Sequence, residues 1–333
     1  MVTRRLRLLA RRLTLPLRLG RTLAPAAREI MAALAGAGHE AGLVGGCVRD
    51  LLLGQAPKDW DMVTSASPGA ILALFPHGKV MGAGRGGNTV LIPRDGEPYE
   101  VTPYRGASLA EDLARRDFTI NAMAAGAEGT LFDPLGGLSD LTRGVIRACG
   151  DPRERIAEDP LRMLRAVRQA AQFGFALDAA LVDAMREAAP RLDDIAPERI
   201  GAEIARLLVT DRAAWGVQQL FELGLLARFA PELTAMAGVE QNQYHRYPVW
   251  EHSLIALSLT PPELHLRLAA LLHDVGKPAT LSVDAGGNRH FYRHEQVGAD
   301  MAGVLLERLR FEGEVRRKVV HLVRYHMDLH FDD

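Results

Sequence analysis

The hydrophobic pattern of the sequence changes once, near residue 146, and this change constrains the fold more than any other feature. Between residues 41 and 145, short apolar runs such as AGLVGG and GNTVLIP alternate with glycine, proline and aspartate, which is typical of a small sheet with a few helices. After that point the apolar residues recur with helical spacing. The sequence therefore predicts an α+β head with a small mixed sheet, followed by an all-helical body.

The 333 residues are enough for two or three domains. We expect a basic extension at 1–28, a head at 29–145, a helical neck and body at 146–240 and a C-terminal helical domain at 241–333. One helix is expected before the sheet, at 27–39. In the helical part, the spacing predicts helices at 155–173, 178–189, 196–209, 213–228, 249–259, 264–274, 294–310 and 312–326.

Residues 1–28 carry eight arginines and no acidic residue, although the whole chain has a net charge of −1. Three interpretations stay open for this segment: a poorly ordered or weakly helical extension, a basic arm that contacts RNA, and a transit-like or membrane-surface segment. The two cysteines do not indicate a disulfide framework, and no apolar run reaches the roughly 18 residues of a membrane span. We therefore expect a cytoplasmic protein with no membrane partner.

The run LVGGCVRDLLLGQAPKDWDMVT predicts a strand, a glycine turn, a short helix and a second strand that carries Asp59 and Asp61. Two carboxylates two residues apart on a strand share one face and repel each other unless a cation lies between them. Magnesium suits such hard oxygen ligands. Gly45 and Gly46 allow backbone N–H groups to approach a phosphate, and Arg49 adds a cation. The pattern favours phosphoryl or nucleotidyl transfer over a solvated turn with two surface aspartates.

This run resembles the signature of the tRNA nucleotidyltransferase and bacterial poly(A) polymerase family, within the polymerase-β-like nucleotidyltransferases. The resemblance continues in order through further blocks and covers about residues 41–210. The later blocks are RRDFTINA at 115–122, DPLGG at 133–137, EDPLRMLRAVR at 158–168 and PERIGAE at 197–203.

The resemblance implies that Asp59 and Asp61 bind the catalytic metal ions. It implies a third carboxylate on a neighbouring strand, for which Glu100 in YEVTPYR is the matching position. Gly46 and Arg49 are implied to contact the nucleoside triphosphate.

The same resemblance assigns Arg116, Asp117 and Asn121 to the ribose and phosphates of the nucleotide. An alternative for the arginines of this block is an ion pair with Asp112 or Asp117.

Asp159 and Arg162 are three residues apart on an expected helix and therefore share one face, as in an ordinary salt bridge. The family resemblance favours a different role, because a carboxylate accepts from the cytosine amine and a guanidinium donates to the ring nitrogen and carbonyl. Adenine fits after a small shift, whereas uracil and guanine do not. Arg165 and Arg168 extend this cationic edge toward the triphosphate or primer, while Gln169 stands where the family has an aromatic residue.

Only six residues, GASLAE, separate Arg105 from Asp112. Family members that add a complete CCA end have a considerably longer flexible loop at this point, and enzymes that add only two cytidines resemble this sequence. A short connection has little reach for rearranging a base-binding site. We therefore favour CC addition, with the alternative that residues 82–88 supply the mobility for full CCA addition.

The last hundred residues contain the pattern His, His-Asp-x-Gly-Lys-Pro and a later His, which resembles the HD-domain phosphohydrolases. Imidazole and carboxylate ligands suit a divalent transition metal that activates water on a phosphate. A degenerate HD fold that only binds RNA is the alternative. The candidate ligands are His252, His273, Asp274, His294, His326 and Asp328.

Together these features predict an enzyme that transfers CMP from CTP to the tRNA 3′ end, without a nucleic-acid template and with two Mg²⁺ ions. Three alternatives stay open. They are a complete CCA-adding enzyme that also uses ATP, a poly(A) polymerase, and a metal-dependent HD phosphohydrolase with a degenerate head.

Overall fold

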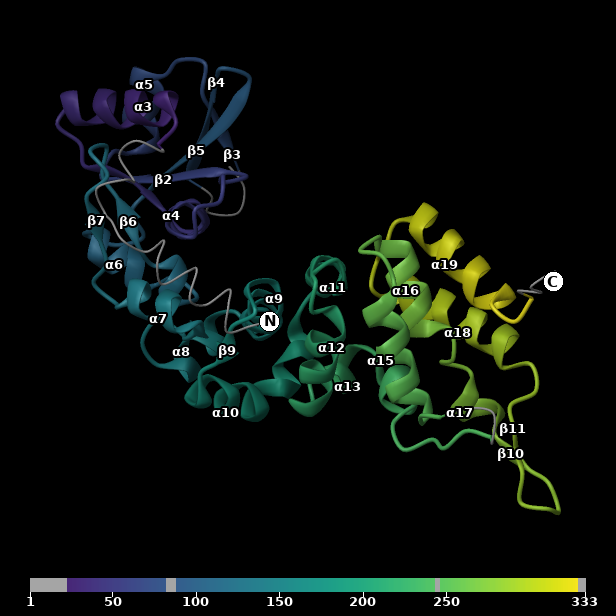
Figure 1. The fold of residues 1–333 in the computed structure, drawn as a ribbon. Coiled ribbons are helices and arrows are strands. Elements are labelled where there is room, and N and C mark those ends of the chain that lie inside the picture. Colours follow the sequence, from purple (N-terminus) through teal and green to yellow (C-terminus); the bar gives the residue numbers. More distant parts are fainter. Residues whose placement is uncertain (1–22, 82–87, 243–245, 329–333) are drawn as a thin grey trace. The chain divides into compact units, whose positions relative to one another are not determined.

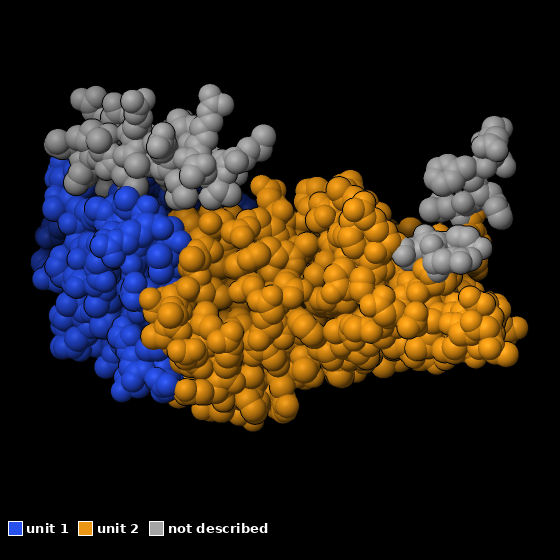
Figure 2. All heavy atoms as spheres, turned by 60° about the horizontal axis from the view of Figure 1, so that its bottom comes forward, with its two compact units in different colours: residues 1–155 blue, residues 156–333 orange. Residues whose placement is uncertain are grey.

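The computed structural model describes residues 23–81, 88–242 and 246–328 (Figure 1). The chain divides into two compact units, residues 1–155 and residues 156–333 (Figure 2). The first unit contains a mixed sheet and the second is largely helical, so the predicted α+β class is confirmed. Among the described residues, no helix is both long enough and apolar enough to cross a bilayer.

The sheet of the first unit has seven strands in the order β3-β4-β5-β2-β1-β6-β7. The central pair, β2 and β5, is parallel, while the other neighbouring strands are antiparallel. The strands are β1 (Ala41–Val44), β2 (Trp60–Thr64), β3 (Lys79–Met81), β4 (Thr89–Arg94), β5 (Glu97–Pro103), β6 (Ala124–Ala125) and β7 (Leu131–Phe132).

Short helices surround this sheet. The first of them, α3, buries Ile30, Met31 and Leu34, because residues three and four apart lie on one helix face. It begins at Pro25, whose fixed φ suits the first turn of a helix. The helices are α3 (Pro25–Gly36), α4 (Gly46–Leu52), α5 (Pro68–Leu74), α6 (Leu109–Ala114), η2 (Thr119–Asn121) and α7 (Gly137–Arg143), and a short strand β8 (Val145–Ile146) follows.

Helix α8 (Pro152–Glu158) leads into the second unit, where nearly all expected helices are present (Figure 1). The elements that follow are α9 (Arg162–Phe173), β9 (Ala176–Leu177), α10 (Ala179–Ala188), η3 (Ala189–Asp194), α11 (Pro197–Leu208), α12 (Ala213–Glu222), α13 (Leu226–Phe229), α14 (Pro231–Thr234), α15 (Val249–Leu259), α16 (Leu264–Leu272), α17 (Lys277–Thr280), β10 (Ser282–Val283), β11 (Arg289–His290), α18 (His294–Arg308) and α19 (Gly313–Tyr325).

Two expected helices are each divided into two, and both breaks have a local cause. The helix expected at 155–173 ends at Glu158 and resumes at Arg162. Proline at 160 has no N–H to donate and disfavours helical backbone at the preceding residue. The helix expected at 213–228 is interrupted at Gly224, whose φ is 72°.

The expectation of a body made of helices alone is corrected by a small antiparallel hairpin, in which β10 pairs with β11. Its turn depends on Asp284, whose Oδ1 accepts from the backbone N–H groups of Gly286 and Asn288, both at 2.9 Å. Such a side-chain turn gives no helical or strand periodicity, so the pattern does not reveal it.

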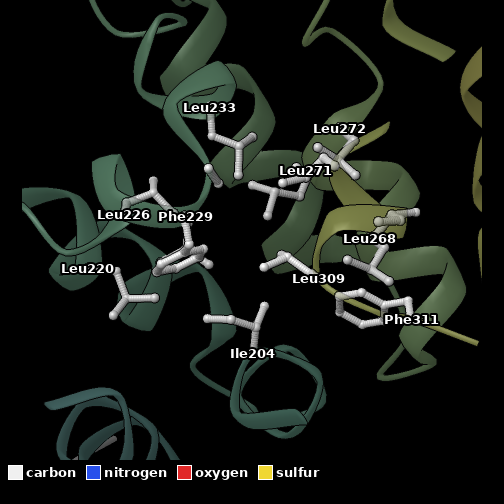
Figure 3. Close-up of a pocket in the computed structure, with 14 residues that line it drawn as sticks. Ile204, Leu220, Leu226, Phe229, Leu233, Leu268, Leu271, Leu272, Leu309 and Phe311 are labelled. Carbon is white, nitrogen blue, oxygen red and sulfur yellow. The ribbon is translucent and has the colours of Figure 1, made fainter. Parts of the chain in front are cut away.

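The core of the second unit is continuous from α11 to α18. A small apolar pocket inside it is lined by side chains from both halves of the unit (Figure 3). Ile204 and Phe229 come from α11 and α13, whereas Leu268 lies on α16 and Leu309 directly follows α18. The helices before residue 240 and those after it therefore bury their apolar faces against each other.

Candidate functional site

The register of the central strands brings two acidic residues side by side. Asp61 on β2 is paired directly with Glu100 on the parallel strand β5. Side chains at paired positions of neighbouring strands project from the same face of the sheet. Asp59 lies in the bend just before β2, two residues from Asp61, and is close enough for its charge to act on the Asp61 carboxyl.

The electrostatics of Asp61 reflect this crowding. Burial, followed by the charges of Glu100 and Asp59, raises the pKa of the Asp61 carboxyl, while the guanidinium of Arg116 acts in the opposite direction. The oxygens of these three residues do not all lie within 4.8 Å of one another in this structure, but carboxylate oxygens are the donors that a hard divalent cation prefers. The residues therefore fit magnesium.

The glycine turn lies against this group of carboxylates. Gly45 has φ 78° and ψ −138°, a conformation that side chains disfavour. A Cβ built on it would lie 3.1 Å from Nη1 of Arg116 and 3.6 Å from Oδ2 of Asp61. The missing side chain thus lets the turn between β1 and α4 approach both the guanidinium and the carboxylate.

Arg49 lies in a buried polar network with two other predicted nucleotide-binding residues. Its Nη1 donates to Oδ1 of Asn121, and its Nε and Nη2 donate to Oδ1 of Asp50. The Nδ2 of Asn121 in turn donates to Oδ1 of Asp117 at 3.1 Å. Residues 72 positions apart in the sequence are therefore held together beside the glycine turn.

The guanidinium of Arg116 is bound to Asp112 and also lies beside the glycine turn. Its Nε and Nη2 donate to Oδ2 of Asp112 at 3.2 and 3.0 Å, as in the ion pair considered as an alternative. Its Nη1 lies 3.1 Å from the position that a Cβ on Gly45 would take, and Oδ2 of Asp61 lies 3.6 Å from the same position. Because Asp112 is 1% exposed, it fixes the guanidinium toward the acidic group. Sequence reasoning gave Asp112 no positioning role, although its i, i+4 spacing to Arg116 is a visible signal.

The predicted base-reading pair does not lie on one helix. Asp159 is in the turn between α8 and α9, and Arg162 is the first residue of α9. Asp159 Oδ1 accepts from the N–H of Leu161 at 3.2 Å, and its Oδ2 accepts from Nη2 of Arg199 at 3.0 Å. Nη1 of Arg162 donates to Glu158 at 2.7 Å. The prediction that Asp159 and Arg162 share one face of a helix is therefore wrong.

The remaining residues of this stretch extend along α9. Arg168 donates through Nε to Oε2 of Glu203 on α11 at 2.6 Å, and both side chains are largely buried. The ion pair between Arg168 and Glu203 therefore connects α9 to α11. Arg165 lies one turn after Arg162 on α9, and Gln169 is buried in the same helix.

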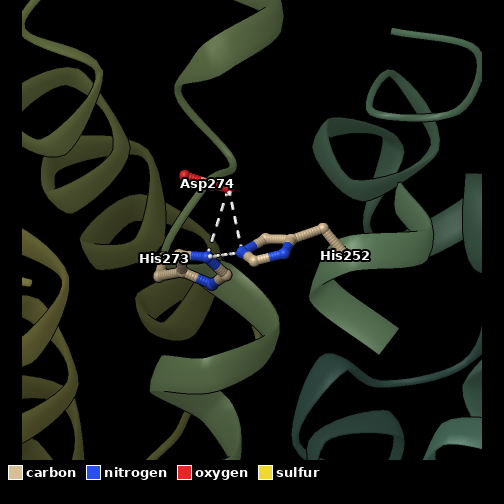
Figure 4. Close-up of side chains that lie close together, drawn as sticks. All are labelled: His252, His273 and Asp274. Atoms are coloured by element: carbon tan, nitrogen blue, oxygen red, sulfur yellow. Dashed lines mark hydrogen bonds and ion pairs between the residues drawn. The ribbon is translucent and has the colours of Figure 1, made fainter. Parts of the chain in front are cut away.

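A second cluster of donor atoms lies in the C-terminal helices and is centred on a buried carboxylate. Asp274 is 1% exposed and directly follows His273 at the end of α16. Its Oδ2 lies 3.2 Å from Nε2 of His273 and 3.8 Å from Nε2 of His252, and the two imidazole nitrogens are 3.1 Å apart (Figure 4).

The other oxygen of Asp274 faces two more histidines. Oδ1 lies 3.4 Å from Nε2 of His294 and 3.8 Å from Nε2 of His326. One carboxylate is thus shared by two sets of three potential ligands. Asp328 is exposed and belongs to neither set, so the placement of this predicted ligand within the cluster is wrong.

Three of the imidazoles are held in a defined orientation by backbone carbonyls. Nδ1 lies 2.9 Å from Ala270 O in His273, 2.8 Å from Phe291 O in His294 and 2.7 Å from Val323 O in His326. When Nδ1–H donates to a carbonyl, the lone pair on Nε2 is directed to the other side of the ring. The Nε2 atoms all face Asp274, as metal ligation requires.

The charge of Asp274 is compensated from within the protein. Burial acts to raise its pKa, but hydrogen bonds with His273 and His294 and the nearby charge of Lys277 outweigh burial and lower the pKa of the carboxyl. Nζ of Lys277 donates to Oδ2 of Asp274 at 2.8 Å and to Gln241 at 2.6 Å. The donors and their geometry fit one or two divalent transition-metal ions.

Three protein-family models match the chain. "Poly A polymerase head domain" matches residues 41–109 and 105–147. "Probable RNA and SrmB- binding site of polymerase A" matches residues 174–236, and "HD domain" matches residues 244–332.

Individual proteins agree with these models. The chain is 40% identical over 312 residues to the CC-adding tRNA nucleotidyltransferase of Thermus thermophilus, which covers 86% of this chain and 68% of that protein. It is 37% identical over 306 residues to the A-adding tRNA nucleotidyltransferase of Deinococcus radiodurans, with the same coverage. The chain spans between 50% and 73% of the length of the curated relatives compared.

A solved structure extends the similarity to three dimensions. The Bacillus stearothermophilus CCA-adding enzyme in complex with CTP matches 92% of this chain and 83% of that protein, with a TM-score of 0.62 and 31% identity. Relatives with CC-adding and A-adding specificity therefore share the sequence pattern of this chain, and a CCA-adding enzyme shares its fold.

Proposed function

The chain belongs to the tRNA nucleotidyltransferase and poly(A) polymerase family, and on this premise we propose that it adds cytidine to the 3′ end of tRNA. The reaction transfers CMP from CTP to the terminal hydroxyl and releases pyrophosphate. The observation that carries the proposal is the direct pairing of Asp61 with Glu100 beside the Gly45 turn. We propose the head at 29–145 for the chemistry and residues 146–240 for base selection and RNA binding.

In the proposed mechanism, Asp59, Asp61 and Glu100 hold the divalent metal ions. When bound, magnesium neutralises charge on the reacting phosphate and favours the ionised form of the attacking hydroxyl. The side chain of Arg116, oriented by Asp112, faces the triphosphate, and Arg49 holds the glycine turn through Asn121. Positioning and charge neutralisation supply most of the rate in such a transfer.

Base selection is proposed to depend on Asp159 and Arg162. An ionised carboxylate accepts from the amine of cytosine but repels the carbonyl oxygen that uracil presents at the same position. Nη2 of Arg199 donates to Oδ2 of Asp159 and so holds the carboxylate in one orientation. Arg162 approaches the ring nitrogen and carbonyl of the base after exchanging its contact with Glu158.

We favour CC addition because the connection between β5 and α6 is short and hydrogen-bonded. The Ser108 side chain caps α6 by accepting from Glu111 N–H, and Glu111 accepts from Ala107 N–H at 3.1 Å. Arg105 N–H donates to Asp112 at 3.1 Å. A connection fixed at both ends supports one arrangement of the base pocket. Residues 82–87 of the alternative segment lie outside the described residues.

The test offers CTP, ATP or both to a tRNA that lacks its CCA end. One or two added cytidines without adenosine support the proposal, whereas C, C and A indicate a complete CCA-adding enzyme. Long adenosine tails indicate a poly(A) polymerase, and addition of adenosine to tRNA ending in CC indicates an A-adding enzyme.

Matched variants test the acidic group itself. Asp61→Asn keeps the side-chain shape but removes the charge, so incorporation should fall by at least about 100-fold at an unchanged fold. Asp95→Asn, in the exposed turn before β5, should retain activity. Full activity of Asp61→Asn would remove the assignment of Asp61.

A second activity is proposed for the C-terminal helices, 241–333: metal-dependent hydrolysis of a phosphomonoester or a 2′,3′-cyclic phosphate. It is supported by the three imidazoles whose Nδ1 atoms contact carbonyls while Nε2 faces Asp274. His294→Asn should lower the bound manganese or nickel measured after dialysis. His265→Asn, a histidine outside the cluster, should not. Equal metal content in both variants would argue against the centre.

A further inference from the structure

A groove opens beside the Asp274 cluster, where α15, α16 and α19 meet. Ala256 of α15 and Thr260, which directly follows that helix, form one part of its wall, and Leu266 of α16 forms another. His321 and Tyr325 of α19 line the remaining side. Helix α16 packs against both α15 and α19, so these walls belong to one packed unit.

No acidic residue, lysine or arginine is among the described residues that line this groove. The lining side chains are alkyl groups, one hydroxyl, one phenol and imidazoles. A charged group entering such a groove would lose hydration without gaining a partner. The part of a ligand that lies in it must therefore be uncharged.

The groove also favours a flat occupant. The rings of His321 and Tyr325 lie on consecutive turns of α19, with centroids 4.8 Å apart and planes inclined by 53°. Aromatic side chains on an exposed wall offer ring faces and edges against which another ring packs. Tyr325 remains 48% exposed, so its ring is accessible.

The groove is continuous with the metal-ligand cluster. His273 and His326 belong to both, because their rings line the groove while their Nε2 atoms face Asp274. Their ring centroids are 5.2 Å apart, and backbone carbonyls fix both rings through Nδ1. A ligand whose phosphate lies at the cluster would thus place its remaining group against these rings.

We propose that this groove is the binding subsite for the flat, uncharged ring of a phosphate monoester whose phosphate group is held at the Asp274 cluster. The inference rests on the metal-dependent function proposed above, and it specifies which esters that site accepts. Phosphates of an aromatic or heteroaromatic compound are favoured over phosphates of a small sugar or polyol.

The experiment uses the full chain loaded with Co²⁺ and two phosphonates that cannot be hydrolysed. Phenylphosphonate carries the ring, and methylphosphonate carries only a methyl group. Their dissociation constants are measured by calorimetry and by changes in the visible Co²⁺ spectrum. We expect phenylphosphonate to bind at least about 10-fold more tightly, because its ring leaves water on binding. Adenosine 5′-monophosphate and ribose 5-phosphate form a second pair, which separates a nucleobase from a simple aryl ring.

Two variants locate the preference in the groove. Ala256→Trp fills it from α15, and Tyr325→Ala removes part of the opposite wall at an exposed position where folding is retained. Both should reduce the advantage of phenylphosphonate while leaving Co²⁺ content and methylphosphonate affinity unchanged. Ser258→Trp, on the same helix but outside the groove, should retain the advantage.

The outcomes separate the two proposals. If the Co²⁺ content is the same in the wild type and in Asp274→Asn, the metal-dependent function and the subsite both fail. If Co²⁺ binds but the two phosphonates bind equally well, or if both groove variants keep the wild-type preference, only the subsite is overturned.

Discussion

Replacing Gly45 with alanine tests the link between the glycine turn and the acidic group. The residue has φ 78° and ψ −138°, so any side chain there is strained, at a cost of about 1–3 kcal/mol. The new Cβ would also stand 3.1 Å from Nη1 of Arg116, close enough to displace the guanidinium by a few tenths of an ångström from the position in which Asp112 holds it. We expect the free energy of unfolding of the head to fall by about 2 kcal/mol.

The displacement should affect catalysis more than the strain does. A Cβ at Gly45 would contact both Nη1 of Arg116 and Oδ2 of Asp61, and small misplacements of a positioning group lower rates steeply. Cytidine incorporation should therefore fall at least about 10-fold. Gly38→Ala is the matched control, because Gly38 has φ 83° but open space around the position of its Cβ. Urea unfolding and incorporation of labelled CMP are measured for both. The reasoning is refuted if folded Gly45→Ala loses no more activity than Gly38→Ala.

Three further predictions follow from contacts in the structure. Arg199→Ala should increase UTP incorporation relative to CTP, because the Asp159 carboxylate loses the contact that orients it. The variant should cost less than about 1 kcal/mol of stability, because Arg199 is half exposed. Arg191→Ala, equally exposed, is the control, and unchanged selectivity would count against the role of Arg199. Burial raises the pKa of the Cys47 thiol to about 12, so iodoacetamide at pH 8 should label it only after unfolding, as mass spectrometry would show, and rapid labelling of the native protein would contradict its burial. Lys277→Met should destabilise the metal-free protein by about 3 kcal/mol, because Asp274 loses its buried ammonium partner and keeps the imidazoles of His273 and His294. Added Mn²⁺ should restore much of this loss in thermal unfolding. An unchanged melting temperature without metal would be inconsistent with the buried pair.

The parts of the site that could be predicted from the sequence depend on local patterns. The spacing of Asp59 and Asp61 after a glycine turn predicts one strand that carries both. In the structure β2 begins at Trp60, so it carries Asp61, and Asp59 lies in the bend just before it. Glu100 was matched by resemblance alone, and its pairing with Asp61 is set by the parallel register of β2 and β5. Register depends on the packing of the whole sheet, so no short segment contains it.

Other features depend on tertiary contacts that the sequence pattern does not contain. Helical spacing placed Asp159 and Arg162 on one face, but the proline at 160 ends the helix and Arg199 provides the partner of Asp159. The sequence offers both His326 and Asp328 as candidate ligands, but only His326 lies beside Asp274, whereas Asp328 is exposed after the end of α19. Which residues after a helix end face a cluster depends on where the following chain runs, and helical spacing alone does not contain that information.

The shared interior around Ile204, Phe229, Leu268 and Leu309 also bears on how such a protein can evolve. The match to the RNA-binding family model ends at residue 236 and the match to the HD model begins at residue 244. Leucines from both sides of that junction nevertheless line the same apolar pocket. Genetic recombination at this junction would join each segment to one from another protein, whose apolar side chains do not match its own. Apolar surface on both segments would then be exposed to water. The two segments are therefore expected to be inherited as one piece, with compensating substitutions on both sides of the junction.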